Sequence, residues 1–320
     1  MTDITTMKTN YHLLEGIYNK CIDLNALYTH SEGLRYMLVR SLTKPILSSI
    51  LSTVLSNENH SKKKIDDLRF QVFENIPVNT LVVYLKTSKT PMEPTIIRQL
   101  TTELKQLCNI DTSSVHQDNF NTNMNQIIRN PDTNSYIKLQ TEVNDILVKQ
   151  LKNYVLWQWY NQKCSDMVEN LILTQSVIIQ TPRKIKYIDF FVEDGETIFP
   201  FDLKLTIFPK GFIKDVKIAN AAEYIRDKKN HTKLLEWLYT EQNPRLFSNN
   251  YRYFIILLDT AAPDQSYKLK CDLELIQTSV DAYFTQFSSS DIHNITYEYK
   301  KDKTKSGVYT TKCMYSIISR

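Results

Sequence analysis

The sequence is poor in glycine, and several signatures of well-known enzyme classes are missing. Only five of the 320 residues are glycine, and neither GxxxxGK[ST] nor GxGxxG occurs. Glycine-rich phosphate loops are therefore excluded, and we predict no nucleotide cofactor. The six histidines are dispersed without HExxH spacing, and no GxSxG is present. These absences argue against a zinc hydrolase and against the nucleophile elbow of a serine hydrolase.

Cysteine is scarce as well, and hydrophobic runs are short. The five cysteines, at positions 21, 108, 164, 271 and 313, are odd in number and never form CxxC. This pattern favours reduced thiols over a disulfide framework or a zinc site. The start of the chain has no apolar segment typical of a signal peptide, and the longest uncharged apolar stretch is too short to span a bilayer. We therefore predict a cytoplasmic protein that does not enter a membrane.

The overall composition is that of an ordinary soluble protein with one large or two modest domains. Apolar residues make up 42% of the chain and charged residues 23%. The net charge of +4 permits binding to nucleic acid but does not require it. Any argument for such a partner therefore depends on where the basic residues cluster.

Residues 186–204 predict a β-hairpin that turns at Asp194-Gly195. Asp-Gly between apolar runs is a strong hairpin signal, because glycine readily takes the positive φ of a type I′ turn. A loop centred on this dipeptide places Asp189 and Asp202 diagonally across the two strands. Because strand side chains alternate between faces, Asp189, Asp202 and Lys204 are predicted to share one face.

Two carboxylates and a lysine on one face suit metal-dependent hydrolysis of phosphodiesters. Carboxylate oxygens are hard ligands for Mg²⁺, which polarises a phosphoryl oxygen and makes bound water more acidic. The arrangement resembles the PD-(D/E)xK nuclease family, with Asp189 as the first acid and Asp202-Leu203-Lys204 as the second acid and the lysine. The family usually has proline beside the first acid, whereas Pro200 here precedes the second. The resemblance implies a Mg²⁺ site formed by Asp189, Asp202 and the Leu203 carbonyl, with Lys204 orienting the attacking water.

The acid–x–lysine spacing also occurs elsewhere, at residues 103–105, 215–217, 227–229 and 298–300. Only Asp202–Lys204 lies in an apolar strand whose hairpin partner carries an acid on the matching face. An exposed hairpin face, on which these charges simply meet water, is the alternative interpretation. Apolar residues on both sides favour the site.

The resemblance also suggests a further acid from a helix ahead of the sheet. We predict a long helix over about residues 141–173, with Glu169 in its last turns. By order and position Glu169 matches the additional family acid, and Glu142 matches less well. A solvated glutamate at a helix end is the alternative.

The remaining patterns predict an α/β protein with a mixed sheet and a helical N-terminal region. Helices are predicted over 10–75, Pro94–Leu107, 220–239 and 269–287, strands over Thr80–Leu85, Ser176–Thr181 and 251–258, and a final hairpin over 292–318. Pro182 is expected to end the strand before it, and 109–135 is predicted to be mainly loop. The order helix, three strands, helix, strand over 141–260 is similar to the PD-(D/E)xK core. We divide the chain into a helical region, 1–130, and a catalytic domain, 131–320, with a C-terminal helix and hairpin.

A basic stretch follows the predicted catalytic strand and offers contacts for DNA phosphates. Its candidate DNA-binding residues are Lys210, Lys214, Lys217, Arg226, Lys228 and Lys229, although each alone could be an ordinary solvated charge. A chain of this size without a motor motif resembles a type II restriction endonuclease, which implies cleavage of double-stranded DNA at a specific sequence by a homodimer. A repair or recombination nuclease of the same superfamily, or a non-catalytic nucleic-acid- or protein-binding module, are the alternatives.

Overall fold

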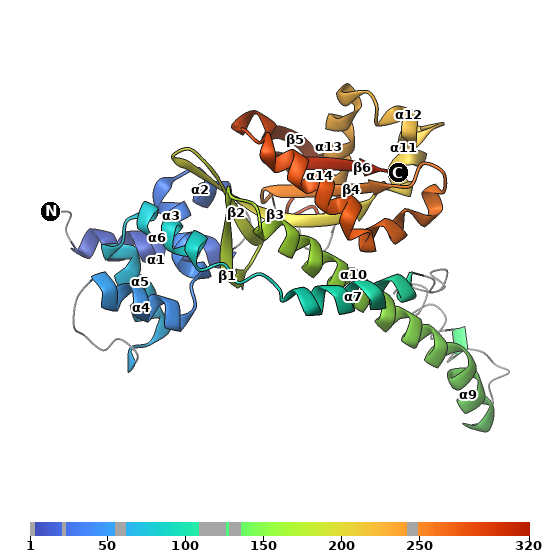
Figure 1. The fold of residues 1–320 in the computed structure, drawn as a ribbon, viewed down its shortest axis with the longest axis horizontal. Helices are drawn as coiled ribbons and strands as arrows, with labels where there is room; N and C mark the ends of the chain where they lie inside the picture. The colour runs from blue at the N-terminus through green and yellow to red at the C-terminus, as the bar shows by residue number, and fades with distance from the viewer. Residues whose placement is uncertain (1–3, 21–23, 55–61, 109–125, 128–135, 242–248) are drawn as a thin grey trace.

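The computed structural model is an α/β protein with a helical N-terminal region and a six-stranded mixed sheet (Figure 1). It describes residues 4–20, 24–54, 62–108, 126–127, 136–241 and 249–320. All six strands of the described residues lie in the C-terminal half of the chain, whereas the sequence predicted strands there and one more, over Thr80–Leu85, in the N-terminal half. The predicted loop over 109–135 and the predicted boundary near residue 130 fall almost entirely outside the described residues. The division into two domains therefore stays a prediction.

Among the residues described in the N-terminal region, six helices form, and they follow the predicted apolar spacing with one exception. They are α1 (Ile4–Lys20), α2 (Asn25–Tyr28), α3 (Ser31–Ser41), α4 (Lys44–Val54), α5 (Ile65–Asn75) and α6 (Val78–Thr87). Helix α6 contains Thr80–Leu85, so the predicted strand there was wrong. Its buried residues Leu81, Val82 and Leu85 follow a helical repeat, which a short β-branched run conceals. At Gly33 a Cβ atom would lie 2.2 Å from the Leu27 carbonyl oxygen, so this close approach of α2 and α3 requires glycine.

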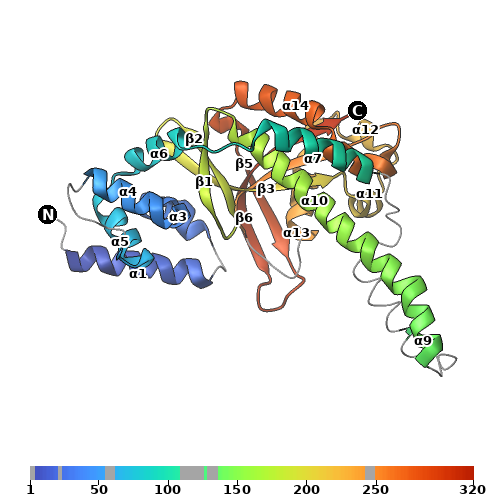
Figure 2. The ribbon, with the colours of Figure 1, turned by 60° about the horizontal axis from the view of Figure 1, so that its bottom comes forward.

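Helix α7 (Pro94–Leu107) has the predicted bounds, and a longer helical segment leads into the sheet. This segment consists of α9 (Tyr136–Glu142), the π-helical turns η2 (Val143–Val148) and α10 (Lys149–Leu173). It therefore starts earlier than the predicted helix over 141–173 and ends at the predicted point. The far end of this segment, with α9, extends away from the rest of the protein in both ribbon views (Figures 1 and 2).

The sheet has the strand order β1-β2-β3-β4-β6-β5. Its strands are β1 (Ile178–Ile185), β2 (Ile188–Asp194), β3 (Thr197–Ile207), β4 (Arg252–Leu258), β5 (His293–Tyr299) and β6 (Gly307–Ser319). Strand β1 continues past Pro182, which the sequence predicted to end it. Proline is tolerated there because β1 is an edge strand and its pairing with β2 is irregular between Gln180 and Ile185.

The β2–β3 hairpin forms around Asp194-Gly195, but its register differs from the prediction. Asp194 pairs with Thr197, so Gly195 and Glu196 form the turn, and Gly195 has a φ of 60°. The pairing is shifted by two residues from a loop centred on Asp194-Gly195. A shift of two keeps every side chain on its predicted face, whereas a shift of one would have reversed them. Asp189, which directly precedes the Phe190–Phe201 pair, therefore comes opposite Asp202 rather than diagonal to it.

Strand β4 is buried on both faces, which explains its apolar run. Its parallel pairing with β3 and β6 needs crossover connections. The first contains α11 (Lys210–Val216), α12 (Ala221–Tyr224), η3 (Lys228–Asn230) and α13 (His231–Glu241). The second contains η4 (Pro263–Cys271), α14 (Leu273–Thr285), η5 (Ser289–Asp291) and β5. Tyr253 and Ile255 share a core cluster with α10 and α14, and Phe254 and Ile256 share one with α11 and α13.

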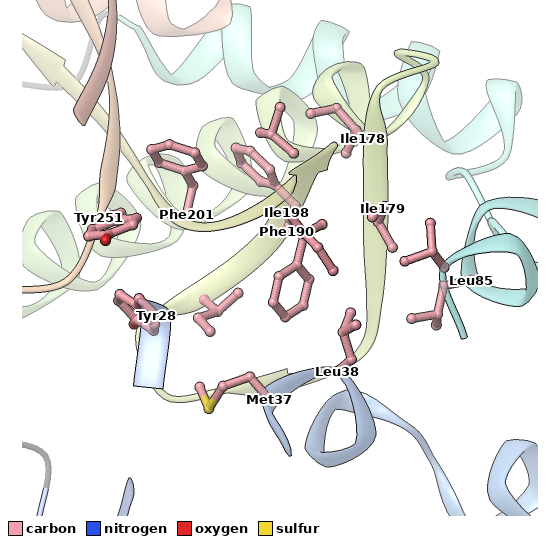
Figure 3. Packing of buried hydrophobic residues seen from close by; sticks show 14 of the residues in the cluster. Tyr28, Met37, Leu38, Leu85, Ile178, Ile179, Phe190, Ile198, Phe201 and Tyr251 are labelled. Carbon is pink, nitrogen blue, oxygen red and sulfur yellow. The ribbon is translucent and has the colours of Figure 1, made fainter. Parts of the chain in front are cut away.

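The N-terminal helices share one apolar core with the hairpin (Figure 3). Met37 and Leu38 of α3 and Leu85 of α6 lie in the same cluster as Ile179 and Phe190 of the sheet. This packing fixes β1 and β2 from one side. Within the part of the chain that the structure describes, no helix is long and apolar enough to cross a membrane.

Candidate active site

The predicted acids and lysine come together where β3 changes its pairing partner. The β2–β3 ladder ends at Phe190–Phe201, and the β3–β4 ladder starts at Asp202. The two strands separate at this point, and a cavity of about 380 Å³ lies beside the separation. It is lined by Gln162, Ser165, Glu169, Lys184, Asp189, Asp202, Leu203, Lys204, Leu205 and Thr206. The four proposed catalytic residues therefore line one cavity.

The Asp189 side chain is hydrogen-bonded to the backbone of β3, just past the point where β2 and β3 stop pairing. Its Oδ2 accepts a hydrogen bond of 2.8 Å from the Leu203 backbone N–H. The pKa of Asp189 is raised to about 7; burial is the main cause, the nearby Asp202 charge adds to it, and the Leu203 hydrogen bond acts in the opposite direction. A carboxyl with this pKa is half protonated near neutral pH, and a cation bound beside it would favour its ionised form.

Asp202 and Lys204 form an ion pair within β3. The Lys204 Nζ lies 2.9 Å from Asp202 Oδ1 and 2.8 Å from Oδ2. The two residues are two positions apart on a strand, so their side chains share a face. The Asp202 side chain is 11% exposed, whereas the Lys204 side chain is 34% exposed. The lysine can therefore reach solvent and a substrate while it stays beside the buried carboxylate.

Two further polar residues contact the Asp202 carboxylate, and the sequence interpretation missed both. Asn250 Nδ2 donates a 3.0 Å hydrogen bond to Asp202 Oδ2, and Arg252 Nε lies 3.9 Å from the same oxygen. The parallel register pairs Asp202 with Arg252, which brings the two side chains to one face. Arg252 is 3% exposed, and its guanidinium lies 4.8 Å from the centre of the Tyr239 ring. The sequence did contain a signal for Arg252, because it is a charged residue at the start of an otherwise apolar strand.

Glu169 reaches the same cavity from α10, where it is paired with a lysine that the sequence interpretation did not single out. Lys184 Nζ lies 3.2 Å from Glu169 Oε2. Burial raises the pKa of Glu169, and Lys184 opposes that effect. Glu142, the second candidate, ends α9, and nothing is described of its side chain. Arg183 and Lys184 form a short basic run just before the hairpin, and this run could have indicated that Lys184 belongs to the site.

The donor groups present fit Mg²⁺ better than a softer metal. Asp189 and Asp202 supply carboxylate oxygens. The Asp202 N–H donates to the Tyr251 carbonyl on the β4 side at 3.0 Å, and successive residues alternate, so the Leu203 carbonyl faces the Asp189 side. Among the described residues, no group of three or more His, Cys, Asp or Glu side chains is arranged to hold a metal ion. Mg²⁺ needs only one or two carboxylates, because it keeps several waters.

The six predicted DNA-binding residues lie together on the crossover after β3, but none lines the cavity. All six are exposed: Lys210, Lys214, Lys217, Arg226, Lys228 and Lys229. Lys210 pairs with Asp264 at 2.6 Å. Lys217 ends α11 in a left-handed conformation, with a φ of 57°. Asn220 caps α12, accepting hydrogen bonds from the backbone N–H groups of Ala222 and Glu223. The crossover is therefore a solvated basic surface.

Comparison with known proteins gave no match: no family model matches the chain, and searches of curated proteins and of solved structures found nothing similar. The geometry of the cavity is thus the basis for any functional assignment.

Proposed function

We propose that this protein is a Mg²⁺-dependent endonuclease of double-stranded DNA, related in its catalytic arrangement to the PD-(D/E)xK nucleases. The observation that carries the proposal is the shared cavity of Asp189, Asp202, Lys204 and Glu169 at the separation of β2 and β3. The element order α10, β1, β2, β3, a helical crossover and β4 supports it, because it corresponds to the core that the resemblance implies.

Asp189, Asp202 and the Leu203 carbonyl would hold the ion. Bound Mg²⁺ supplies polarisation of a phosphoryl oxygen and a more acidic water. The chain's own residues do the positioning. Lys204, fixed by Asp202, orients a water molecule for in-line attack on phosphorus and stabilises the developing negative charge. Glu169, which accepts a hydrogen bond from Lys184 in the same cavity, would assist by accepting a hydrogen bond from that water.

The exposed basic crossover is a surface that could bind the DNA backbone. Lys214, Lys217, Arg226, Lys228 and Lys229 can neutralise phosphates, and Lys210 can join them by leaving Asp264. Such contacts hold a duplex without reading its sequence. Sequence-specific cutting by a homodimer, as in a type II restriction enzyme, is the further part of this proposal.

The proposal is tested by incubating plasmid DNA with the purified protein in Mg²⁺ or in EDTA. We expect discrete fragments with Mg²⁺ and none with EDTA. Asp202→Ala should abolish cutting, because it removes a metal ligand and the partner of Lys204. Glu298→Ala is the matched control, since Glu298 has the same spacing to Lys300 but is exposed on β5.

Each result has a clear meaning. Cutting that survives Asp202→Ala would reject the site. A random smear that needs Mg²⁺ and Asp202 would support a nuclease without sequence specificity, such as a repair enzyme. A shift of DNA in a gel without cutting under any divalent-ion condition would replace the proposal with a binding module.

A further inference from the structure

A pair of thiols lies where the end of α7 meets the end of η4. Cys108 follows α7 directly, and Cys271 is the last residue of η4. The two positions are 163 residues apart in the chain, yet their Sγ atoms lie 2.8 Å apart. A disulfide has an S–S length of about 2.05 Å, so forming the bond requires a movement of less than about 1 Å.

Hydrogen bonds between the same elements hold the two sulfurs in place. The Tyr160 hydroxyl of α10 donates to the Tyr267 carbonyl of η4 at 2.8 Å and lies 3.6 Å from Cys108 Sγ. The Tyr267 hydroxyl in turn donates to the Cys108 carbonyl at 3.2 Å. Cys108 and Cys271 are 7% and 4% exposed, and both belong to the small core between α7, α10 and η4. The thiols are therefore preorganised for one another.

We propose that Cys108 and Cys271 are a redox modification site that a peroxide oxidises to an intramolecular disulfide. The Cys108 thiolate attacks one peroxide oxygen, the O–O bond breaks, and hydroxide leaves to give a sulfenic acid. The Cys271 sulfur then attacks the Cys108 sulfur, the S–O bond breaks, and water leaves with the Cys271 proton. Two thiols and one hydrogen peroxide thus give one disulfide and two waters.

The environment of Cys108 suits the first step. A hydrogen bond from the Cys271 thiol is the main cause that lowers the pKa of Cys108 to about 6, and burial opposes it. The thiolate is the nucleophilic form of cysteine. Cys313 differs, because burial raises its pKa and it lies in the other core, between the sheet and α13. The dithiol does not line the candidate active site and does not depend on the proposed nuclease activity.

The test uses the full-length protein, treated with dilute hydrogen peroxide, quenched with an alkylating reagent and digested for mass spectrometry. We expect a cross-linked peptide pair containing Cys108 and Cys271, with two hydrogen atoms lost and restored by dithiothreitol. The oxidised protein should melt on the order of 5 °C higher than the reduced one, because the bond closes a long loop. Cys108→Ser and Cys271→Ser should each remove both effects, and Cys313→Ser should keep them.

Two results would overturn the proposal. One is oxidation of Cys108 to sulfinic acid in the wild-type protein with no cross-link to Cys271. The other is a cross-link from Cys108 to Cys164 or Cys21 instead. Alkylation of the untreated native protein provides a measurement that no variant's folding can affect: Cys108 should react first, and peroxide should protect it.

Discussion

Two acid–x–lysine stretches of this chain have the same spacing and the same internal ion pair but different surroundings. Asp202 and Lys204 lie in β3, and Glu298 and Lys300 lie at the end of β5, with the two Nζ atoms 2.8 Å and 2.7 Å from their carboxylates. The Asp202 side chain is 11% exposed, whereas that of Glu298 is 55% exposed. Spacing alone therefore does not define a site.

The surroundings explain why we place the proposed site at the first stretch. The Asp189 carboxylate lines the same cavity as Asp202. Asn250 donates a hydrogen bond to Asp202, and Arg252 lies close to the same oxygen of Asp202. Water is partly excluded there, so charges interact more strongly than on the surface. The Glu298 pair lies in solvent, where such a contact contributes little. Four measurements test this difference between the two stretches.

The largest effect is expected for removal of Lys204, the lysine that we propose to be catalytic. Lys204→Ala should lower the rate of Mg²⁺-dependent DNA cleavage by about 10²- to 10³-fold, because one preorganised charge at the reacting group is lost. Lys300→Ala should leave the rate unchanged. Single-turnover cleavage of plasmid DNA measures both. Equal cleavage rates for the two variants would show that Lys204 contributes no more to cleavage than Lys300.

The second measurement concerns the pH dependence of stability without metal. The Asp189 carboxyl keeps its proton up to pH about 7 in the folded protein but releases it near pH 3.9 when unfolded. The folded state thus binds more protons in this window, and the free energy of unfolding falls as pH rises through it. Asp189→Asn should remove this dependence, so its free energy of unfolding relative to that of wild type should rise by about 4 kcal/mol between pH 4 and pH 8.

Urea denaturation in EDTA at several pH values provides this difference. Asp302→Asn is the control, since the pKa of Asp302 is lowered by hydrogen bonds from Thr304 rather than raised. Parallel pH profiles for wild type and Asp189→Asn would contradict the burial of an acid beside Asp202. Addition of Mg²⁺ at pH 8 should stabilise wild type and leave Asp189→Asn nearly unaffected, because the cation favours the ionised carboxylate.

A smaller effect is expected for the arginine behind Asp202. Arg252→Met keeps the apolar stem but removes the charge 3.9 Å from Asp202, and should lower the free energy of unfolding by about 2 kcal/mol. The loss is limited because the Nε and Nη1 atoms of Arg252 have no hydrogen-bond partner. Arg320→Met, which removes the pairs with Asp259 and Asp272, should change stability less, because the Arg320 side chain is 56% exposed. The reverse order would mean that Arg252 does not support the site.

The smallest effect is expected on the basic crossover. Lys228→Ala combined with Lys229→Ala should weaken DNA binding several-fold and lower the slope of log affinity against log salt by about 2. The cleavage rate of bound DNA should stay the same. Lys44→Ala combined with Lys62→Ala removes the same charge from the N-terminal region and should leave the slope unchanged. Fluorescence anisotropy of labelled DNA over a series of salt concentrations measures this slope for the two double variants.

Much of the fold was predictable where local patterns were long or strongly marked. The apolar spacing of Pro94–Leu107 and the buried run of β4 gave correct elements, and so did the Asp-Gly turn. Predictions failed where tertiary packing overrode a local preference. The β-branched run in α6 is helical because it packs on other helices and β1, and Pro182 remains in β1 because that strand lies at the sheet edge. The hairpin register was missed because glycine can occupy either of two turn positions.

Which side chains share a face of β2 and β3 can be read from the sequence alone, because alternation along a strand is a local property. The sequence could not show that Arg252 lies beside Asp202, or that Asp189, Asp202, Glu169 and Lys184 line one cavity. The same holds for the sulfurs of Cys108 and Cys271. Contacts between residues so far apart in the chain depend on how the whole sheet and its helices pack, which no short pattern encodes.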